Sequence, residues 1–146
     1  MNPQGPGQVL FAFVRHWARR SSLGDPGAAE QGRLVLVAEA VHALTERGIA
    51  ATVNAVAHEI GIDQSGASRL IKSATEAGHL SIEASRADGR RREVSLTGAG
   101  RSMLDEAHRW QEQVFDQLTA DWSDGRRRDF QRAMTDLIDR SYALDV

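Results

Sequence analysis

The sequence predicts a mainly helical protein with one small β-hairpin. Most of its 146 residues lie in segments whose apolar positions recur at helical spacing. Two of these segments are short and nearly adjacent, and two alternating segments follow them on either side of an arginine-rich turn. The length suits one domain with its own hydrophobic core, so we expect residues 1–146 to fold as a single domain.

The N-terminal part, residues 9–48, is expected to form two helices. The first, residues 9–20, has apolar residues at helical spacing along one side. These residues are Leu10, Phe13, Val14 and Trp17. A polar segment with glycines and a proline separates it from the second helix, which ends near Gly48. The second helix is apolar most of the way around, which predicts a central, buried position.

Two short helices follow, and together they predict a helix-turn-helix. Thr52 is suited to cap the first helix, and Gly61 can supply the left-handed residue that ends it. Asp63 can cap the second helix, which ends near Gly78. Ala57 is small enough to let the two helices approach each other. The residues expected to fill the space between them are Ile60, Ile62 and Leu70.

A hairpin follows the two short helices. Apolar residues alternate with polar ones on both sides of the segment SRADGRRRE, which predicts two strands joined by an arginine-rich loop. These apolar residues are Leu80, Ile82, Ala84, Val94 and Leu96. The hairpin forms the wing of a winged helix-turn-helix, which we expect to span residues 49–100.

The C-terminal part, residues 101–146, is expected to be helical. From Thr97 onward the apolar face is wide enough to contact more than one surface. After a break at residues 123–125, a last helix is expected to bury one apolar stripe. That stripe consists of Phe130, Met134, Leu137 and Ile138.

The apolar stripes near the two ends of the chain predict a homodimer. A small domain could not easily cover both, and exposing them would leave apolar patches of roughly several hundred square ångströms. Packing within one chain is the alternative. We therefore expect the first helix and residues 101–146 to act as dimerisation helices that flank the winged helix-turn-helix.

The composition excludes several classes of function. The chain has no cysteine, which excludes disulfides, thiolate zinc sites and cysteine nucleophiles. It has neither a long apolar segment nor a secretory signal pattern, so we expect a cytoplasmic protein. No phosphate-binding or dinucleotide-binding glycine pattern occurs, and His58 and Glu59 lack the second histidine of a zinc-protease helix. We therefore expect no enzymatic activity, no cofactor and no metal site.

Positive charge is concentrated in the middle of the chain. The whole chain has a net charge of −2, but residues 63–101 contain seven basic and five acidic residues. Residues 102–146 contain six basic and ten acidic residues. A local basic surface, not the total charge, attracts phosphate, so the acidic total does not exclude a nucleic-acid partner.

The second short helix has a polar side that contains no acidic residue. Its residues on this side are Gln64, Ser65, Ser68, Arg69 and Lys72. Arginine and glutamine can form paired hydrogen bonds with base edges in a major groove, while serine and lysine can contact phosphates. The positive end of the helix dipole favours phosphate as well. The alternative is an ordinary solvated helix face.

The arginines of the hairpin turn favour the DNA interpretation. Arg90, Arg91 and Arg92 follow Asp88 and repel one another unless an anion is near. An arginine from such a loop can enter a narrow minor groove, where the negative potential is enhanced. Strand alternation allows one or two of the three to do so, and we expect Asp88 to pair with one of them. Arg86, in the same loop, is a further candidate for DNA contact. Helix and wing together predict binding to double-stranded DNA.

Residues 52–100 resemble the core of the MarR family of bacterial transcription regulators. The most specific matches are the Asp-Gly-Arg-Arg turn, Leu96-Thr97 with Ala99-Gly100, and Ser68-Arg69. The sequence departs from the family at Ile82, where a basic residue is usual, and at Ala84, where a proline is frequent. The DNA-contacting residues that the resemblance carries over are Ser65, Ser68, Arg69, Asp88 and Arg90.

The resemblance implies a homodimer whose recognition helices enter successive major grooves of a pseudo-palindromic operator. It also implies repression as the commoner mode, and release from DNA by a small aromatic or phenolic ligand. Candidate effector-binding residues are Trp17, His42 and Trp110, for which core or interface packing is the alternative.

Two other functions fit the same sequence. A winged helix could grip an acidic protein through its arginines, as a protein-interaction module. A metal-responsive regulator of the same fold could use His108 with Glu112, or His42 with Glu39. The lack of cysteine and of a dense histidine cluster makes the metal site the weaker of the two.

Overall fold

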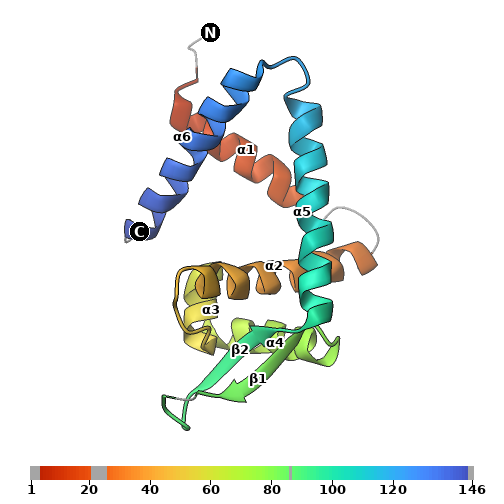
Figure 1. Cartoon of the computed structure of the whole chain (residues 1–146), viewed down its shortest axis with the longest axis vertical. Coiled ribbons are helices and arrows are strands. Elements are labelled where there is room, and N and C mark those ends of the chain that lie inside the picture. The colour runs from red at the N-terminus through yellow and green to blue at the C-terminus, as the bar shows by residue number, and fades with distance from the viewer. Residues whose placement is uncertain (1–3, 21–25, 86, 145–146) are drawn as a thin grey trace. The chain divides into compact units, whose positions relative to one another are not determined.

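The computed structural model describes residues 4–20, 26–85 and 87–144, which form helices and one hairpin (Figure 1). The prediction of a mainly α fold with a small β-hairpin wing is confirmed. In chain order the elements are α1 (Pro6–Arg20), α2 (Pro26–Glu46), α3 (Val53–Ile60), α4 (Gln64–Glu76), β1 (Leu80–Ala84), β2 (Arg92–Leu96), α5 (Gly98–Leu118) and α6 (Asp124–Ala143).

The chain forms two compact units, residues 1–107 and 108–146, and the boundary falls inside α5. The first unit contains the main hydrophobic core, in which α2 packs against α3, α4 and β2. Val37 and Val41 of α2 are fully buried, as are Val56 of α3 and Ile71 of α4. The predicted central position of residues 34–44 is confirmed for most of the helix, although Leu36 is exposed.

The helix-turn-helix forms as its capping residues predict. The Thr52 hydroxyl accepts the Ala55 N–H at 3.1 Å, and the Asp63 carboxylate accepts the Gly66 N–H at 2.7 Å. Gly61 has a φ of 82°, a left-handed conformation that glycine adopts without steric cost. Its N–H donates to the Ala57 carbonyl oxygen at 2.9 Å and closes the turn.

The expected filling of the space between the two helices is wrong at one residue. Ile60 and Leu70 are partly buried and pack against the core, but Ile62 is 38% exposed. The N–H of Ile62 also donates to the Ala57 carbonyl oxygen, at 3.0 Å, so Ile62 lies within the tight turn after Gly61. Ile62 is therefore not part of the core cluster.

The hairpin pairs Leu80 with Leu96 at its base and Ala84 with Arg92 near its turn. Leu80 and Val94 are buried, and the Val94 N–H donates to the Ala51 carbonyl oxygen at 2.8 Å. This bond joins the outer edge of β2 to the segment before α3. The base of the wing is therefore part of the core.

The two strands form as predicted, but burial along β1 does not continue beyond Leu80. Ile82 is 38% exposed and Ala84 is also exposed. The alternation of apolar and polar residues is real, but the turn of the hairpin lies outside the helical part of this unit (Figure 1). The core therefore ends before it reaches these two residues.

The second unit is held together by aromatic contacts near the turn between α5 and α6. The Phe115 and Phe130 rings stack with centroids 5.9 Å apart, and the Trp122 ring meets Phe130 edge-on at 5.5 Å. The Arg126 guanidinium lies 4.0 Å from the centre of the Trp122 ring. Ser123 caps α6 by accepting the Arg126 N–H at 3.1 Å, so the helix begins within the predicted break.

The predicted burial of the α6 stripe does not occur within the chain. Phe130, Met134, Leu137 and Ile138 are between 37% and 51% exposed, and none of the described residues of α6 is buried. The aromatic contacts reach only as far as Phe130, so the stripe beyond it has no cover in its own unit. No helix in the described part of the chain is long and apolar enough to cross a membrane.

Candidate nucleic-acid interface

Helix α4 separates an apolar side from a polar one. Ala67, Ile71 and Ala74 are buried against the core. The five polar residues of the opposite side are all exposed: Gln64, Ser65, Ser68, Arg69 and Lys72. The structure therefore places these candidate residues together on one solvent-facing surface.

The wing turn is shaped by hydrogen bonds to the backbone. The Asp88 carboxylate accepts the Arg90 N–H at 3.0 Å, and the Asp88 carbonyl oxygen accepts the Arg91 N–H at 3.0 Å. The Ser85 N–H donates to the Arg91 carbonyl oxygen at 2.8 Å, and the Ser85 hydroxyl accepts the Ala87 N–H at 3.2 Å. These contacts form a compact turn of the kind that aspartate and serine favour.

The expected pairing of Asp88 with an arginine side chain is wrong, because its carboxylate bonds to the backbone instead. Among the described residues, no ion pair engages the guanidinium groups of Arg90, Arg91 or Arg92, and all three are exposed. Arg86, the fourth candidate of the wing, lies outside the described residues. The turn thus keeps three positive groups available to an anion.

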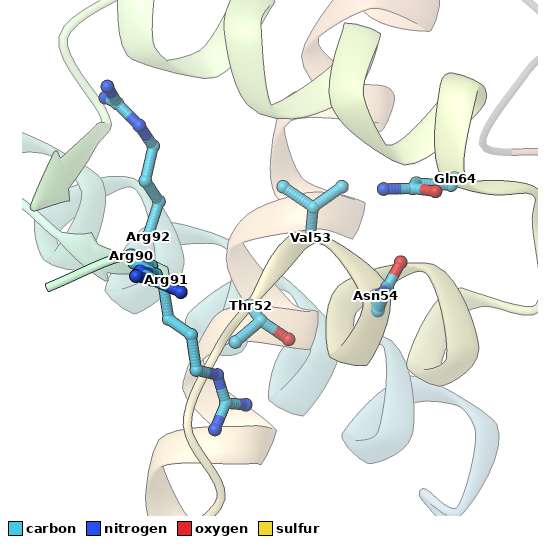
Figure 2. Close-up of a pocket in the computed structure, with 7 residues that line it drawn as sticks. All are labelled: Thr52, Val53, Asn54, Gln64, Arg90, Arg91 and Arg92. Carbon is cyan, nitrogen blue, oxygen red and sulfur yellow. The ribbon is translucent and has the colours of Figure 1, made fainter. Parts of the chain in front are cut away.

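An open concavity of about 440 Å³ lies between the wing and the first turns of α3 and α4. Its lining consists of Thr52, Val53, Asn54, Gln64, Arg90, Arg91 and Arg92. Figure 2 shows the arginines on one side of this concavity and the helical residues on the other, with the arginine side chains extending in different directions. The divergence agrees with the expectation that neighbouring arginines cannot all reach one groove.

The first turn of α3 was not among the residues predicted from the sequence to contact DNA. Thr52 was assigned only as a cap, while Val53 and Asn54 were not singled out. The first N–H groups of a helix have no acceptor within it, and the cap here takes the N–H of Ala55. The N–H groups of Val53 and Asn54 therefore remain at the positive end of the helix dipole. The signal was available, because a cap residue marks the end where an anion can bind.

The concavity combines features that suit an anionic partner. Three arginines and the starts of two helices contribute positive potential to one surface. Two carboxylates adjoin the lining residues in sequence: that of Asp63 accepts the Gly66 N–H as a helix cap, and Glu93, next to Arg92, is half-buried. This surface is therefore electrostatically suited to an anionic partner.

Among the comparisons with known proteins, the one with solved structures finds similarity, and this similarity is one of architecture. No protein-family model matches the sequence, and no curated protein matches it. Among solved structures, MarR superposes with a TM-score of 0.70 and 19% identity, over 98% of this chain and 95% of that chain. An S. aureus MepR variant bound to an oligodeoxyribonucleotide superposes with a TM-score of 0.57 and 14% identity, over 94% and 99% of the chains.

A third structure concerns the regulation of DNA binding of Bordetella bronchiseptica BpsR by 6-hydroxynicotinic acid. It superposes with a TM-score of 0.55 and 22% identity, over 88% of this chain and 94% of that chain. The chain has the winged-helix fold of the MarR-family regulators. In this MarR-type fold α3 and α4 form the helix-turn-helix and the β1–β2 hairpin is the wing.

The three candidate effector residues lie on different helices of the MarR-type fold. Trp17, on α1, has its ring 6.3 Å from that of Phe13 and 5.7 Å from that of His16. His42 is half-buried on α2, and Trp110 is exposed on the part of α5 that belongs to the second unit. Their assignment to an effector site stays a prediction. The described residues include no group of three or more histidine, aspartate or glutamate side chains that could hold a metal ion.

Proposed function

We propose that this protein is a transcription regulator that binds double-stranded DNA in a sequence-specific manner as a homodimer. One observation carries the proposal: three arginines without an ion pair among the described residues, the first turn of α3 and Gln64 at the start of α4 border a single concavity, and the rest of the polar side of α4 is exposed beside Gln64 on the same helix. An enzyme would need a nucleophile with its base or a bound metal, and this surface has neither arrangement among the described residues.

The chemistry of each side chain suggests its role on DNA. The α4 residues Gln64 and Arg69 would form paired contacts with base edges in the major groove, while Ser65, Ser68 and Lys72 would contact phosphates. The N–H groups at the start of α3 would hold a phosphate between the two grooves. One or two wing arginines would then enter the neighbouring minor groove.

The homodimer is supported by apolar surfaces that one chain leaves exposed. Phe13 and Val14 of α1 are each about half exposed, and the stripe on α6 is exposed as well. A second copy would cover such surfaces in a symmetric assembly. Two recognition helices would then contact half-sites roughly 10 base pairs apart in a pseudo-palindromic operator.

Repression relieved by a small aromatic ligand is the finer part of the proposal. The BpsR structure concerns control of DNA binding by 6-hydroxynicotinic acid, a small aromatic acid, which supports ligand control in this fold. For this chain the candidate contacts are Trp17, His42 and Trp110. The regulator is proposed to act in the cytoplasm, where its DNA target is found.

The test is a selection of duplexes from a random library, followed by fluorescence anisotropy on the enriched duplex and a shuffled duplex of equal composition. We expect tighter binding to the enriched duplex at every salt concentration, with one dimer per site. Both affinities should fall as salt rises, because phosphate contacts release counterions. Equal affinity for the two duplexes would contradict the proposal and favour the protein-interaction alternative.

A further inference from the structure

Thr97 lies where α4, the wing and α5 meet. It follows β2 directly, and its hydroxyl donates to the carbonyl oxygen of Gly78 at 2.6 Å. Gly78 is the residue with a φ of 86° just after α4. The same hydroxyl oxygen accepts the N–H of Gly100, in the first turn of α5, at 3.1 Å. One side chain thus connects the end of α4 to the start of α5.

The backbone of Thr97 makes two further hydrogen bonds. The Thr97 N–H donates to the carbonyl oxygen of His79 at 3.1 Å, and the Thr97 carbonyl oxygen accepts the N–H of Arg101 at 3.0 Å. Gly100 is buried so closely that a Cβ atom there would clash with the His79 carbonyl oxygen. The first turn of α5 therefore lies directly against the backbone that leaves α4.

We propose that Thr97 is a positioning residue, whose hydroxyl fixes the direction of α5 relative to α4. A hydroxyl that only capped α5 would need its bond to Gly100 and nothing more. The second bond, to the carbonyl oxygen of Gly78, connects the helix start to a different element, 19 residues away in sequence. Two bonds from one short side chain restrict rotation of α5 about its first turn.

The consequence for DNA rests on the proposed function. If α4 contacts base edges, the direction of α5 sets how the two recognition helices of a dimer are spaced. Loss of the Thr97 hydroxyl should then weaken binding to a duplex with two half-sites more than binding to a duplex with one. We expect Thr97→Val to weaken two-site binding by about tenfold, which corresponds to about 1.4 kcal/mol.

The direct test measures the α4–α5 geometry without DNA. The chain has no cysteine, so cysteines introduced as Ser73→Cys on α4 and Asp105→Cys on α5 accept spin labels at chosen sites only. Both positions are exposed and outside the proposed DNA contacts. The doubly labelled chain is mixed with a large excess of unlabelled chain, so that each dimer contains at most one labelled copy. Pulsed electron resonance then gives the distribution of distances between the two labels.

We expect one narrow distance distribution for the parent chain, a broader or shifted one for Thr97→Val, and recovery in Thr97→Ser, which keeps a hydroxyl. Thr75→Val is the matched control. It removes an equivalent hydroxyl whose 2.7 Å bond to the Ile71 carbonyl oxygen stays within α4, and it should leave the distribution unchanged. An unchanged distribution in folded Thr97→Val would overturn the proposal, even if the protein bound DNA as proposed. An altered distribution in a protein without DNA preference would overturn only the proposed function.

Hydrogen exchange of the parent chain covers the case in which Thr97→Val does not fold. If the two bonds of the Thr97 hydroxyl hold the end of α4 and the start of α5 together, the amides of Thr97 and Gly100 open together and exchange with similar protection. Far faster exchange at Gly100 than at Thr97 would mean that α5 opens independently, and it would overturn the proposal.

Discussion

Arg47 and Glu59 form a two-pronged ion pair between the segment after α2 and the last turn of α3. The Arg47 Nη2 atom lies 2.6 Å from Glu59 Oε2, and Nη1 lies 3.1 Å from Oε1. The two side chains are 26% and 15% exposed, so both charges are largely withdrawn from water. A paired arrangement of this kind fixes geometry as well as charge. It holds the first helix of the helix-turn-helix against the central helix.

Breaking this pair should destabilise the fold measurably. Replacing Arg47 by methionine leaves the Glu59 carboxylate largely buried and uncompensated, and we expect a loss of about 1–2 kcal/mol, discounted for partial exposure. Urea unfolding followed by circular dichroism measures the loss. Arg132→Met is the control, because Arg132 lies 3.9 Å from Asp129 and both are well exposed, so its removal should change little. Equal effects of the two changes would mean that the buried pair contributes no more than an exposed one.

Substitution by alanine should reduce the stability of the fold to different extents at two glycines. At Gly61 a Cβ atom would meet open space, so Gly61→Ala costs only the left-handed backbone, about 1–2 kcal/mol. At Gly100 the Cβ atom would clash with the His79 carbonyl oxygen, which cannot move without disturbing β1, so Gly100→Ala should lose far more stability than Gly61→Ala. Thermal unfolding of both variants compares them, and a milder effect at Gly100 would contradict the packing described for Thr97 and its neighbours.

Asp88→Ala separates the shape of the wing from its charge. The change removes a negative charge, so electrostatics alone predicts tighter binding to any duplex. Loss of the bond to the Arg90 N–H should instead loosen the turn and reduce the preference for an enriched duplex over a shuffled one. Asp88→Asn keeps an acceptor oxygen and should retain the preference. Fluorescence anisotropy measures the affinity of each variant for the two duplexes. An undiminished preference in Asp88→Ala would mean that the carboxylate does not shape the DNA-contacting turn.

Replacing Arg69 and replacing Lys72 by alanine should change DNA affinity in different ways, which a salt series can separate. If Arg69 contacts a base edge, Arg69→Ala costs about 1–3 kcal/mol on the enriched duplex and relaxes the preference at one base pair. If Lys72 contacts a phosphate, Lys72→Ala weakens binding to all duplexes and lowers the slope of log affinity against log salt by about one. Salt titrations of both variants on both duplexes make the comparison. Identical behaviour would assign both side chains to phosphate contact.

The sequence was most informative where a local rule fixes the backbone. Thr52 and Asp63 were identified as caps because their short oxygen-bearing side chains suit helix starts, and both accept the expected N–H groups. Gly61 was identified as the turn residue for its tolerance of positive φ. The polar side of α4 followed from helical spacing alone. In each case the outcome depends on a few neighbouring residues.

The errors arose where the outcome depends on distant parts of the chain. Ile62 looks like a core residue, but its burial depends on where the core ends, which sequence spacing does not encode. Asp88 has arginines as neighbours, yet the turn brings the Arg90 N–H closer to its carboxylate. Val53 and Asn54 join the wing arginines only because α3 and the hairpin turn meet in three dimensions.

The exposed apolar stripe on α6 predicts that one charged substitution within it makes the protein monomeric. Leu137 lies in the middle of this stripe and is 45% exposed in one chain, a state that a second copy would bury. Leu137→Glu would place a carboxylate in that apolar contact, and its desolvation opposes assembly. Light scattering after size exclusion should show the parent chain as a dimer and Leu137→Glu as a monomer with unchanged helix content. Gln131→Glu is the control, because it adds the same charge to an exposed polar position of α6 and should stay dimeric. A dimeric Leu137→Glu would place the dimer contact elsewhere, and a monomeric parent chain would leave the apolar faces of both α1 and α6 without the partner proposed for them.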